Sequence, residues 1–219
     1  MNAEFIDPTI KLMSIFLGLM TIWIALAALS TWRRQLIGQK KADIAENILT
    51  LFIKACHCIS DARTPSVTQN EIRARPRFKE EPDDLKPQLL AMLGMAYAPI
   101  LRFEQQKEFW RELQASQYKF IINFTDKRIM PTEFYSRLLE IKRAIIRASK
   151  NFIEQQLRIE TPSYKARLRL EDALWKKEDE SLQEKQKIIW EGVDEQDEIN
   201  KDLEEIMADL EKVCLPALR

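Results

Sequence analysis

Glycine is scarce in this chain of 219 residues, which contains only Gly18, Gly38, Gly94 and Gly192. Because these four residues lie far apart in the sequence, they cannot form a glycine-rich loop of the kind that holds nucleotide phosphates. Turn-forming residues are also few, and no alternating pattern of useful length indicates a strand. Long stretches rich in Leu, Ile, Glu, Lys, Arg and Gln instead favour helices throughout. The sequence therefore predicts an all-α fold.

Histidine and cysteine are also rare. With His57 as the single histidine, the chain cannot contain the paired Glu-x-x-His motifs of a di-iron bundle or the His-Glu-x-x-His motif of a zinc enzyme. Cys56 and Cys58 flank this histidine, but on a helix they point about 200° apart and cannot share one zinc ion. With Cys214 they form an odd set without a disulfide framework, which a reducing compartment tolerates. We expect no metal, no cofactor and no enzymatic activity.

Two charged stretches are candidates for other ligands. Residues 194–205, DEQDEINKDLEE, carry many carboxylates but lack the glycine of an EF-hand loop, so calcium binding is only weakly indicated. Residues 73–79, RARPRFK, are basic, yet the acidic stretch EEPDD begins at residue 80. No element suited to a nucleic-acid groove accompanies them. We expect no nucleic acid among the partners.

One long apolar run stands out near the N-terminus. Residues 12–32 carry no charge and are bounded by Lys11 on one side and by Arg33 and Arg34 on the other. About 20 apolar residues are enough to cross a hydrocarbon core, and the Leu, Ile and Phe residues of this run contribute roughly −3 to −5 kcal/mol to insertion. The small residues near its end resemble a signal-peptidase site, but the acidic N-terminus and the length of the run favour a retained anchor. We predict a transmembrane helix.

Positive charge follows this run rather than preceding it. The predicted membrane flank comprises Trp32, Arg33, Arg34, Lys40 and Lys41. Lys11 is the only Lys or Arg on the N-terminal side, so the positive-inside rule places residues 1–11 outside and the rest of the chain in the cytoplasm. The prediction is a single-pass membrane protein with its C-terminal domain in the cytoplasm.

Small residues recur along the apolar run at alternating spacings of four and three. They are Ser14, Gly18, Thr21, Ala25 and Ala28. On a helix this spacing puts a smooth stripe on one face, which lets two helix backbones approach closely in a membrane. The sequence therefore predicts self-association through the anchor.

Helical periodicity continues beyond the flank. Apolar residues at 3.6-residue spacing extend the first helix to about Ala62, and the proline-rich residues 64–86 are expected to form a loop. Further helices are expected at residues 87–124 with a kink at Pro99, at 131–160, at 163–190 and at 196–213. We predict an antiparallel three-helix bundle from residues 33–162. Residues 163–219 would form an acidic hairpin that packs on this bundle or on a partner.

The last predicted helix carries a short heptad pattern. Its apolar positions are Ile199, Leu203, Ile206, Leu210 and Val213. Two heptads are too few for an independent coiled coil, so this stripe should pack either on the bundle or on a protein partner.

The connection at residues 120–131 combines apolar and basic residues. The candidates for lipid contact are Phe120, Ile122, Lys127, Arg128 and Ile129. If the second long helix starts level with the end of the first, it returns to the level of Arg33 near Gln117, since thirty residues rise about 45 Å. The connection would then touch the bilayer surface. Alternatively, its apolar residues close the bundle core.

Three stretches resemble a group of uncharacterised bacterial single-span membrane proteins. They are TWRRQLIGQKKADIAENIL at 31–49, IIWEG at 188–192 and VCLPALR at 213–219. The resemblance implies a bacterial inner-membrane location and brings no known activity or site residues. We expect a membrane-anchored interaction or scaffold protein that self-associates or docks a protein partner. The alternative is a lipid-sensing or envelope-stress factor whose 120–131 connection contacts anionic lipid.

Overall fold

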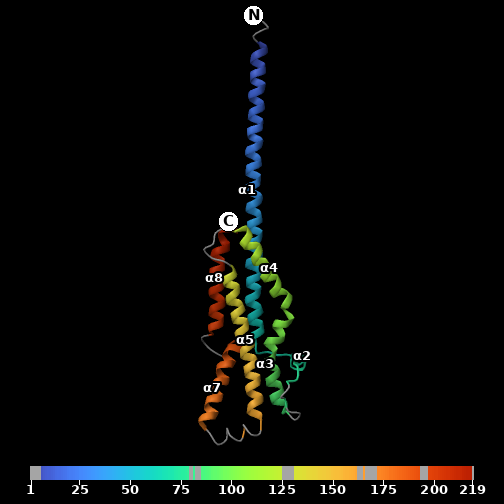
Figure 1. The fold of residues 1–219 in the computed structure, drawn as a ribbon, viewed down its shortest axis with the longest axis vertical. Coiled ribbons are helices and arrows are strands. Elements are labelled where there is room, and N and C mark those ends of the chain that lie inside the picture. The colour runs from blue at the N-terminus through green and yellow to red at the C-terminus, as the bar shows by residue number, and fades with distance from the viewer. Residues whose placement is uncertain are drawn as a thin grey trace.

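The computed structural model describes residues 6–78, 81, 85–124, 131–161, 165, 172–192 and 197–218. Nearly all of these residues are helical and none forms a strand, which confirms the predicted all-α fold. A long N-terminal helix leads into a helical bundle (Figure 1). The described helices are α1 (Ile6–Arg63), α2 (Gln69–Ala74), α3 (Pro87–Gln105), α4 (Lys107–Asn123), α5 (Pro131–Glu160), α7 (Asp172–Ile189) and α8 (Glu198–Leu218).

Helix α1 runs without a break for 58 residues. At 1.5 Å per residue it is about 87 Å long, and Figure 1 shows it as one straight rod. It ends at Arg63, one residue from the predicted end, shortly before Pro65, which cannot continue a helix. Its start at Ile6 lies within the predicted N-terminal segment, so the helix begins before the apolar run does.

The bundle consists of two layers stacked along its length (Figure 1). The proximal layer, nearer to the anchor segment, packs the second half of α1 against α4, the first half of α5, and α8. The distal layer packs the first half of α3 against the second half of α5 and α7. α5 belongs to both layers, and its buried Leu138, Ile145 and Phe152 follow the wide stripe expected from the sequence.

Helix α8 belongs to the core of the proximal layer. Leu203, Ile206 and Leu210 are buried there with residues of α1 and α5. Consequently, the boundary proposed at residue 162 does not separate two packing units, because the bundle formed by residues 33–162 would lack one wall of its core. Helix α8 extends to Leu218, five residues beyond its expected end. Gly192 follows α7 with a positive φ of 78°, a backbone conformation that is typical of glycine after the end of a helix.

The second long helix, expected to be continuous with a kink at Pro99, is interrupted at Gln106. Pro99 is buried inside α3, whereas the backbone at Gln106 leaves helical geometry with φ −94° and ψ 13° and separates α3 from α4. The break follows the last turn of α3, where Arg102 is held by carbonyl groups at the end of α1. These are tertiary contacts, which local sequence patterns do not reveal.

Helix α2 lies within residues 64–86, where we expected only a loop. Thr68 and Glu71 form a capping box, in which each side chain accepts a hydrogen bond from the backbone N–H of the other. This Thr-x-x-Glu pattern was readable in the sequence. Helix α2 packs closely on α3 at Gly94, where an added Cβ would lie 2.8 Å from Ile72 Cγ2. Only glycine permits this approach.

Candidate interaction interface along the anchor helix

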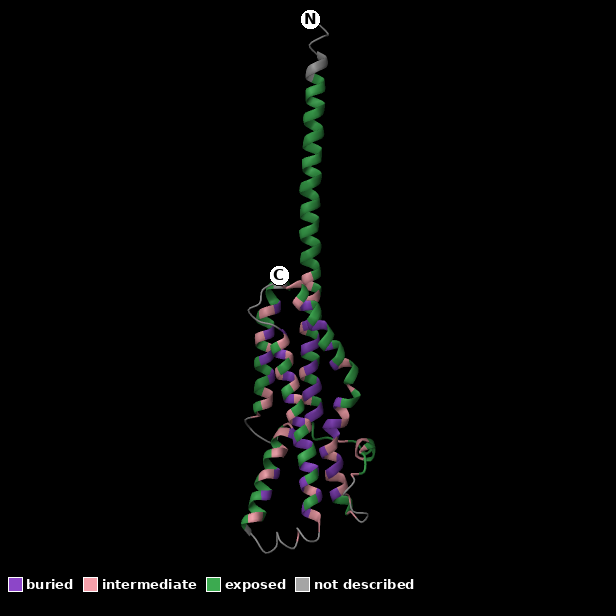
Figure 2. Cartoon of the chain, viewed as in Figure 1, coloured by how far each residue is buried: buried purple, intermediate pink, exposed green. Residues whose placement is uncertain are grey.

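The N-terminal half of α1 makes no packing contact with the bundle. Residues 10–40 are all exposed, and α1 is the one described helix that is long and apolar enough to cross a membrane (Figure 2). An apolar surface of this size is unfavourable in water. Lipid or protein must therefore cover it. The flank residues Trp32, Arg33, Arg34 and Lys40 are exposed beyond it, and Lys41 is half-buried where the bundle begins.

The stripe of small residues, Ser14, Gly18, Thr21, Ala25 and Ala28, lies along this exposed part. The two hydroxyl groups bond within the helix: Ser14 Oγ donates to the Lys11 carbonyl and Thr21 Oγ1 to the Leu17 carbonyl, each at 2.8 Å. Another helix can therefore approach the stripe closely, and neither hydroxyl group needs a hydrogen-bond partner on that helix.

The part of α1 inside the bundle also has one uncovered face. Its exposed residues are Asp43, Glu46, Asn47, Thr50, Ile53, Lys54, His57 and Asp61. Each residue of an α-helix turns by about 100°, so all eight lie within about 60° of the direction of the stripe. The buried residues Ile48, Phe52 and Ile59 lie on the opposite side. The stripe and the uncovered face therefore form one continuous face of α1, directed away from the bundle.

The basic flank residues lie on the other side of α1. Arg33, Arg34, Lys40 and Lys41 fall between about 80° and 200° from the stripe, the sector that is buried against the bundle farther along. Lys41 supports this placement, because its Nζ lies 5.9 Å from the centroid of the Phe124 ring of the bundle. The stripe face carries none of the four flank cations.

The end of α4 lies farther from Arg33 than we expected. Phe124 is beside Lys41, eight residues beyond Arg33 and therefore about 12 Å farther along α1. We had expected the start of the second long helix, Pro87, to lie level with the end of α1, but Arg102 lies there instead. The predicted position of the end of α4 was therefore wrong. The first fifteen residues of α3 instead form part of the distal layer.

The candidate lipid-contact residues differ in their surroundings. Phe120 is buried in the proximal core and its ring stacks on that of Phe124, with centroids 3.9 Å apart. Ile122 is 79% exposed in the last turn of α4. Lys127, Arg128 and Ile129 lie outside the described residues.

The heptad stripe of α8 faces the bundle. Leu203, Ile206 and Leu210 are buried, and Ile199 and Val213 are half-buried against the same core. These side chains are therefore already covered within the chain, which resolves the two alternatives in favour of packing on the bundle.

Arg63, the last residue of α1, is fully buried and was not predicted as a site. It caps the C-terminal end of α7: Nε donates to the Ile188 carbonyl at 3.1 Å, and Nη2 donates to those of Lys187 at 3.0 Å and Trp190 at 3.3 Å. A cation at a helix C-terminus also interacts favourably with the helix dipole. The Arg63 carbonyl in turn accepts from Glu191 N at 3.0 Å.

The same guanidinium binds the start of α8. Nη1 donates to Asp197 Oδ1 at 3.0 Å and to Asn200 Oδ1 at 3.3 Å, and Nη2 lies 2.8 Å from Asp197 Oδ2. Asp197 caps α8, because its Oδ1 also accepts from the backbone N–H groups of Ile199 and Asn200. Arg63 thus joins the ends of α1, α7 and α8. Its partners are more than 120 residues away in sequence, so no local signal reveals it.

A second arginine holds the end of α1 from the other side. Arg102 Nη1 donates to the carbonyls of Asp61 at 2.7 Å and Thr64 at 2.9 Å, and Nη2 donates to that of Ser66 at 2.6 Å. Its Nε donates to Glu71 Oε1 at 2.7 Å. Arg102 therefore ties α1, α2 and α3 together. Its hydrogen bond is the main reason why the pKa of Glu71 is lowered to about 2.

Acid should weaken this contact. The pKa of Glu71 is lower in the folded chain than in the unfolded chain, so its stabilisation is complete above about pH 4.5 and is lost as the pH falls towards about 2. We expect Glu71→Gln to reduce the loss of stability between these pH values, measured as the denaturant midpoint of the full chain in detergent. The control is Glu108→Gln, which removes an exposed carboxylate that also pairs with an arginine. Equal acid sensitivity of the Glu71 variant and the wild type would contradict the assignment.

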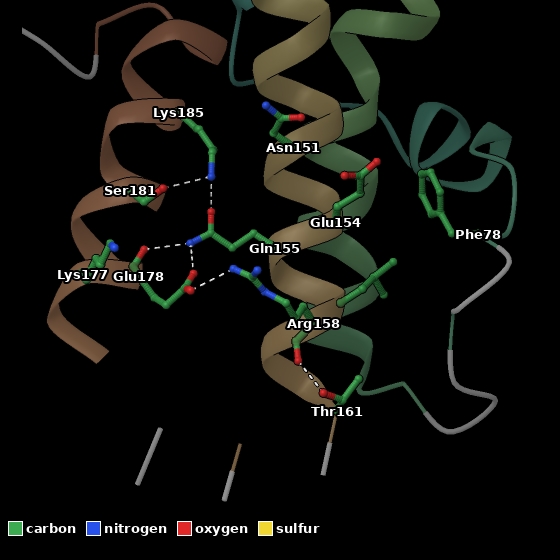
Figure 3. Close-up of a pocket in the computed structure, with 11 residues that line it drawn as sticks. Phe78, Asn151, Glu154, Gln155, Arg158, Thr161, Lys177, Glu178, Ser181 and Lys185 are labelled. Atoms are coloured by element: carbon green, nitrogen blue, oxygen red, sulfur yellow. Dashed lines mark hydrogen bonds and ion pairs between the residues drawn. The ribbon is translucent and has the colours of Figure 1, made fainter. Parts of the chain in front are cut away.

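A groove of about 880 Å³ lies between α5 and α7 (Figure 3). The Gln155 amide donates to the Glu178 carbonyl at 3.0 Å and to the Glu178 carboxylate, and Arg158 Nη2 donates to Glu178 Oε1 at 2.8 Å. Lys185 Nζ donates to Gln155 Oε1 and to Ser181 Oγ. These contacts join α5 and α7 across the groove, and burial lowers the pKa of Lys185. We interpret the network as a structural link between the two helices.

Cys56 and Cys58 lie on α1, and Cys214 lies on α8. Cys56 lines a groove of about 490 Å³ between α1 and α8 beside His57, whereas Cys58 and Cys214 are buried in the core. Within the described ranges, no three His, Cys, Asp or Glu side chains are placed to hold a metal ion. Burial is the main cause that raises the pKa of Cys56 and of Cys214 to about 11, and it also raises that of Cys58.

These thiols should react slowly. At pH 8 a thiol with a pKa of about 11 is roughly 0.1% thiolate, against about a quarter for an ordinary cysteine. The higher nucleophilicity of a more basic thiolate recovers about tenfold of this difference. We therefore expect maleimide to label the folded chain at least tenfold more slowly than a short cysteine peptide, as measured by mass spectrometry. The chain unfolded in detergent should take up three labels; rapid labelling of the folded chain would contradict the burial.

Comparison of the chain with known protein families, curated proteins and solved structures found no match. The candidate interface must therefore be interpreted from its own geometry.

Proposed function

We propose that this chain is a membrane-anchored helical interaction protein that self-associates through the stripe face of α1. The anchor would cross the inner membrane once, with the bundle in the cytoplasm. One observation carries the proposal: the stripe of small residues lies on the same side of α1 as the uncovered face of its bundle part, opposite the packed helices.

This arrangement matters because packed helices approach to about 8–10 Å, and closer where small residues meet. If α4, α5 or α8 covered the stripe side, the bundles of two copies would collide before their anchors touched. With the bundles on the opposite side, two parallel α1 helices can meet along the stripe. The flank cations would also not face each other across this contact, since they lie on the bundle side.

The orientation in the membrane rests on the distribution of basic residues. Arg33, Arg34, Lys40 and Lys41 follow the apolar run, and only Lys11 precedes it. The positive-inside rule favours a cytoplasmic bundle on this basis. Three free cysteines are compatible with that reducing compartment.

In-cell crosslinking tests the proposal. A full-length chain with a C-terminal tag would be crosslinked in cells, captured in detergent and analysed by mass spectrometry. Adducts of the chain with itself would support self-association. A stoichiometric adduct with one other protein would make the chain a subunit of that partner and shift the docking surface away from the stripe. Adducts no more abundant than those of an unrelated single-pass control would contradict an interaction role.

A further inference from the structure

The groove of about 490 Å³ between α1 and α8 combines an apolar floor with an acidic rim. The buried Leu203 and the half-buried Cys56 and Met207 form its floor. Two exposed carboxylates, Glu204 and Glu211, stand along its α8 side. Among the described residues, no lysine or arginine lines the groove.

The two rim carboxylates have a regular spacing. Glu204 and Glu211 are seven residues apart on α8, so they lie on the same side of this helix, about 10 Å from each other along its axis. Met207 and Ala208 lie between them, about one turn from each carboxylate. An apolar contact surface is therefore flanked by one negative charge at either end.

The cations nearest in sequence do not line this groove. Lys201 and Lys212 lie about 60–100° farther around α8 than the two carboxylates, and Lys212 Nζ pairs with Asp209 Oδ1 at 2.9 Å. On α1, Lys54 turns towards α4, where its Nζ lies 5.0 Å from the centroid of the Phe109 ring. The rim of the groove therefore keeps its negative charge.

The middle of the groove lies beyond the reach of the chain segments that the structure does not describe. Met207 is about 13 Å along α8 from the start of this helix, whereas residues 193–196, tied at both ends, extend at most about 9 Å. Residues 125–130 start at Phe124, about 22 Å from the level of Cys56 along α1, and their full length is about 25 Å. They cannot cover that distance and also return to α5.

We propose that this groove binds a basic amphipathic helix of another protein. Apolar side chains of that helix enter between Cys56 and Met207, and a lysine or arginine on either side of them pairs with Glu204 and Glu211. Positions i and i+7 of an α-helix repeat the spacing of about 10 Å between the two carboxylates, with positions i+3 and i+4 between them. Met207 suits such a contact, because its unbranched side chain adapts to different apolar partners.

A second copy of this chain fits the groove less well. Both anchors would cross the same membrane in the same direction, so each copy would bring Glu204 and Glu211 to the same height and place like charges opposite one another. The groove also opens on the α8 side of α1, about 70° around this helix from the stripe. The inference is therefore independent of self-association.

A synthetic peptide tests the inference. The probe is a fluorescein-labelled, alanine-based helix with lysines at i and i+7 and leucines at i+3 and i+4. The control peptide has the same composition, with its lysines moved to the opposite face. Both are titrated with the full-length chain in phosphatidylcholine nanodiscs, and binding is measured by fluorescence anisotropy. We expect the probe to bind about tenfold more tightly than the control peptide, through two ion pairs whose contribution falls with added salt.

Charge variants locate the binding site of the probe. Glu204→Gln with Glu211→Gln should weaken binding about tenfold, since two exposed ion pairs are lost. The matched control, Glu180→Gln with Glu184→Gln, removes the same charge from exposed positions on α7 and should leave binding unchanged. Ala208→Lys places a cation at an exposed position between the two carboxylates and should also weaken binding. Equal binding of the two peptides, or equal loss in the two double variants, would overturn the docking site.

Crosslinking of the same variants tests a second copy as the occupant. If Glu204→Gln with Glu211→Gln reduced the adducts of the chain with itself and left the probe bound, a second copy would fill the groove and the inference would be wrong. Adducts that do not decrease, together with weakened probe binding, would support it. Neither result depends on whether the stripe mediates self-association.

Discussion

Replacing Arg63 by alanine should lower the free energy of unfolding by about 3–5 kcal/mol, the cost of removing one partner from a buried ion pair. The substitution leaves the largely buried Asp197 side chain, 11% exposed, without its cation, and it removes three hydrogen bonds from the carbonyl groups at the end of α7. The ends of α7 and α8 would both lose a cap. No other described ionic side chain joins three helices while fully buried.

Denaturant unfolding of the full-length chain in detergent measures this effect. Arg63→Lys keeps the charge but not the planar fork, so its loss should be smaller than that of Arg63→Ala but clearly measurable. The matched control is Arg111→Ala, because Arg111 is 61% exposed and pairs with Glu108 on its own helix. Exposed pairs of this kind contribute about 0.2–1 kcal/mol. If Arg63→Ala cost no more than Arg111→Ala, the buried contacts would not stabilise the bundle as described.

Leucine at Gly18 and Ala25 should abolish self-association of the anchor. Both positions lie on the stripe, where two added side chains would hold the helix backbones apart and remove the close packing that drives association in lipid. An added Cβ at Gly18 meets nothing within 4 Å in the single chain, so the substitution leaves the fold of one copy undisturbed. An in-membrane dimerisation reporter fused to α1 should fall to the level of a monomeric control helix.

The matched control uses the same chemistry on the other face. Ala27→Leu adds the same side chain at about 220° from Ser14 around the helix, on the side of the bundle. It should leave the reporter signal unchanged. Equal loss in both variants would indicate a general effect on insertion, and no loss in the stripe variant would remove the stripe as the contact.

The sequence predicts the helices of this protein far better than it predicts their positions relative to one another along the bundle axis. α1 is readable because one apolar run and one helical period follow each other without a helix breaker. The position of the end of α4 along α1 cannot be predicted from the sequence. It depends on Arg102, fifteen residues after the start of α3, which contacts the end of α1. Helix α2 is an intermediate case: its capping box at Thr68 and Glu71 was present in the sequence, but the surrounding prolines outweighed it.

The candidate interface shows the same division. The stripe and the flank cations were identified from spacing alone. The sequence did not show that they lie on opposite sides of α1 relative to the bundle. This became visible only from the buried face of α1, which is defined by contacts with α4, α5 and α8. Arg63 was missed for a related reason, since an isolated arginine at the end of a helix is usually solvated.

Because α1 is a single rigid helix, its exposed stretch fixes the rotation of the bundle as well as its distance. One residue inserted between Arg34 and Lys40 would advance the bundle by only 1.5 Å but turn it by about 100°. Seven inserted residues would nearly restore the original rotation. The number of residues between the apolar run and the bundle therefore keeps the stripe and the uncovered face of the bundle part of α1 on the same side of the helix.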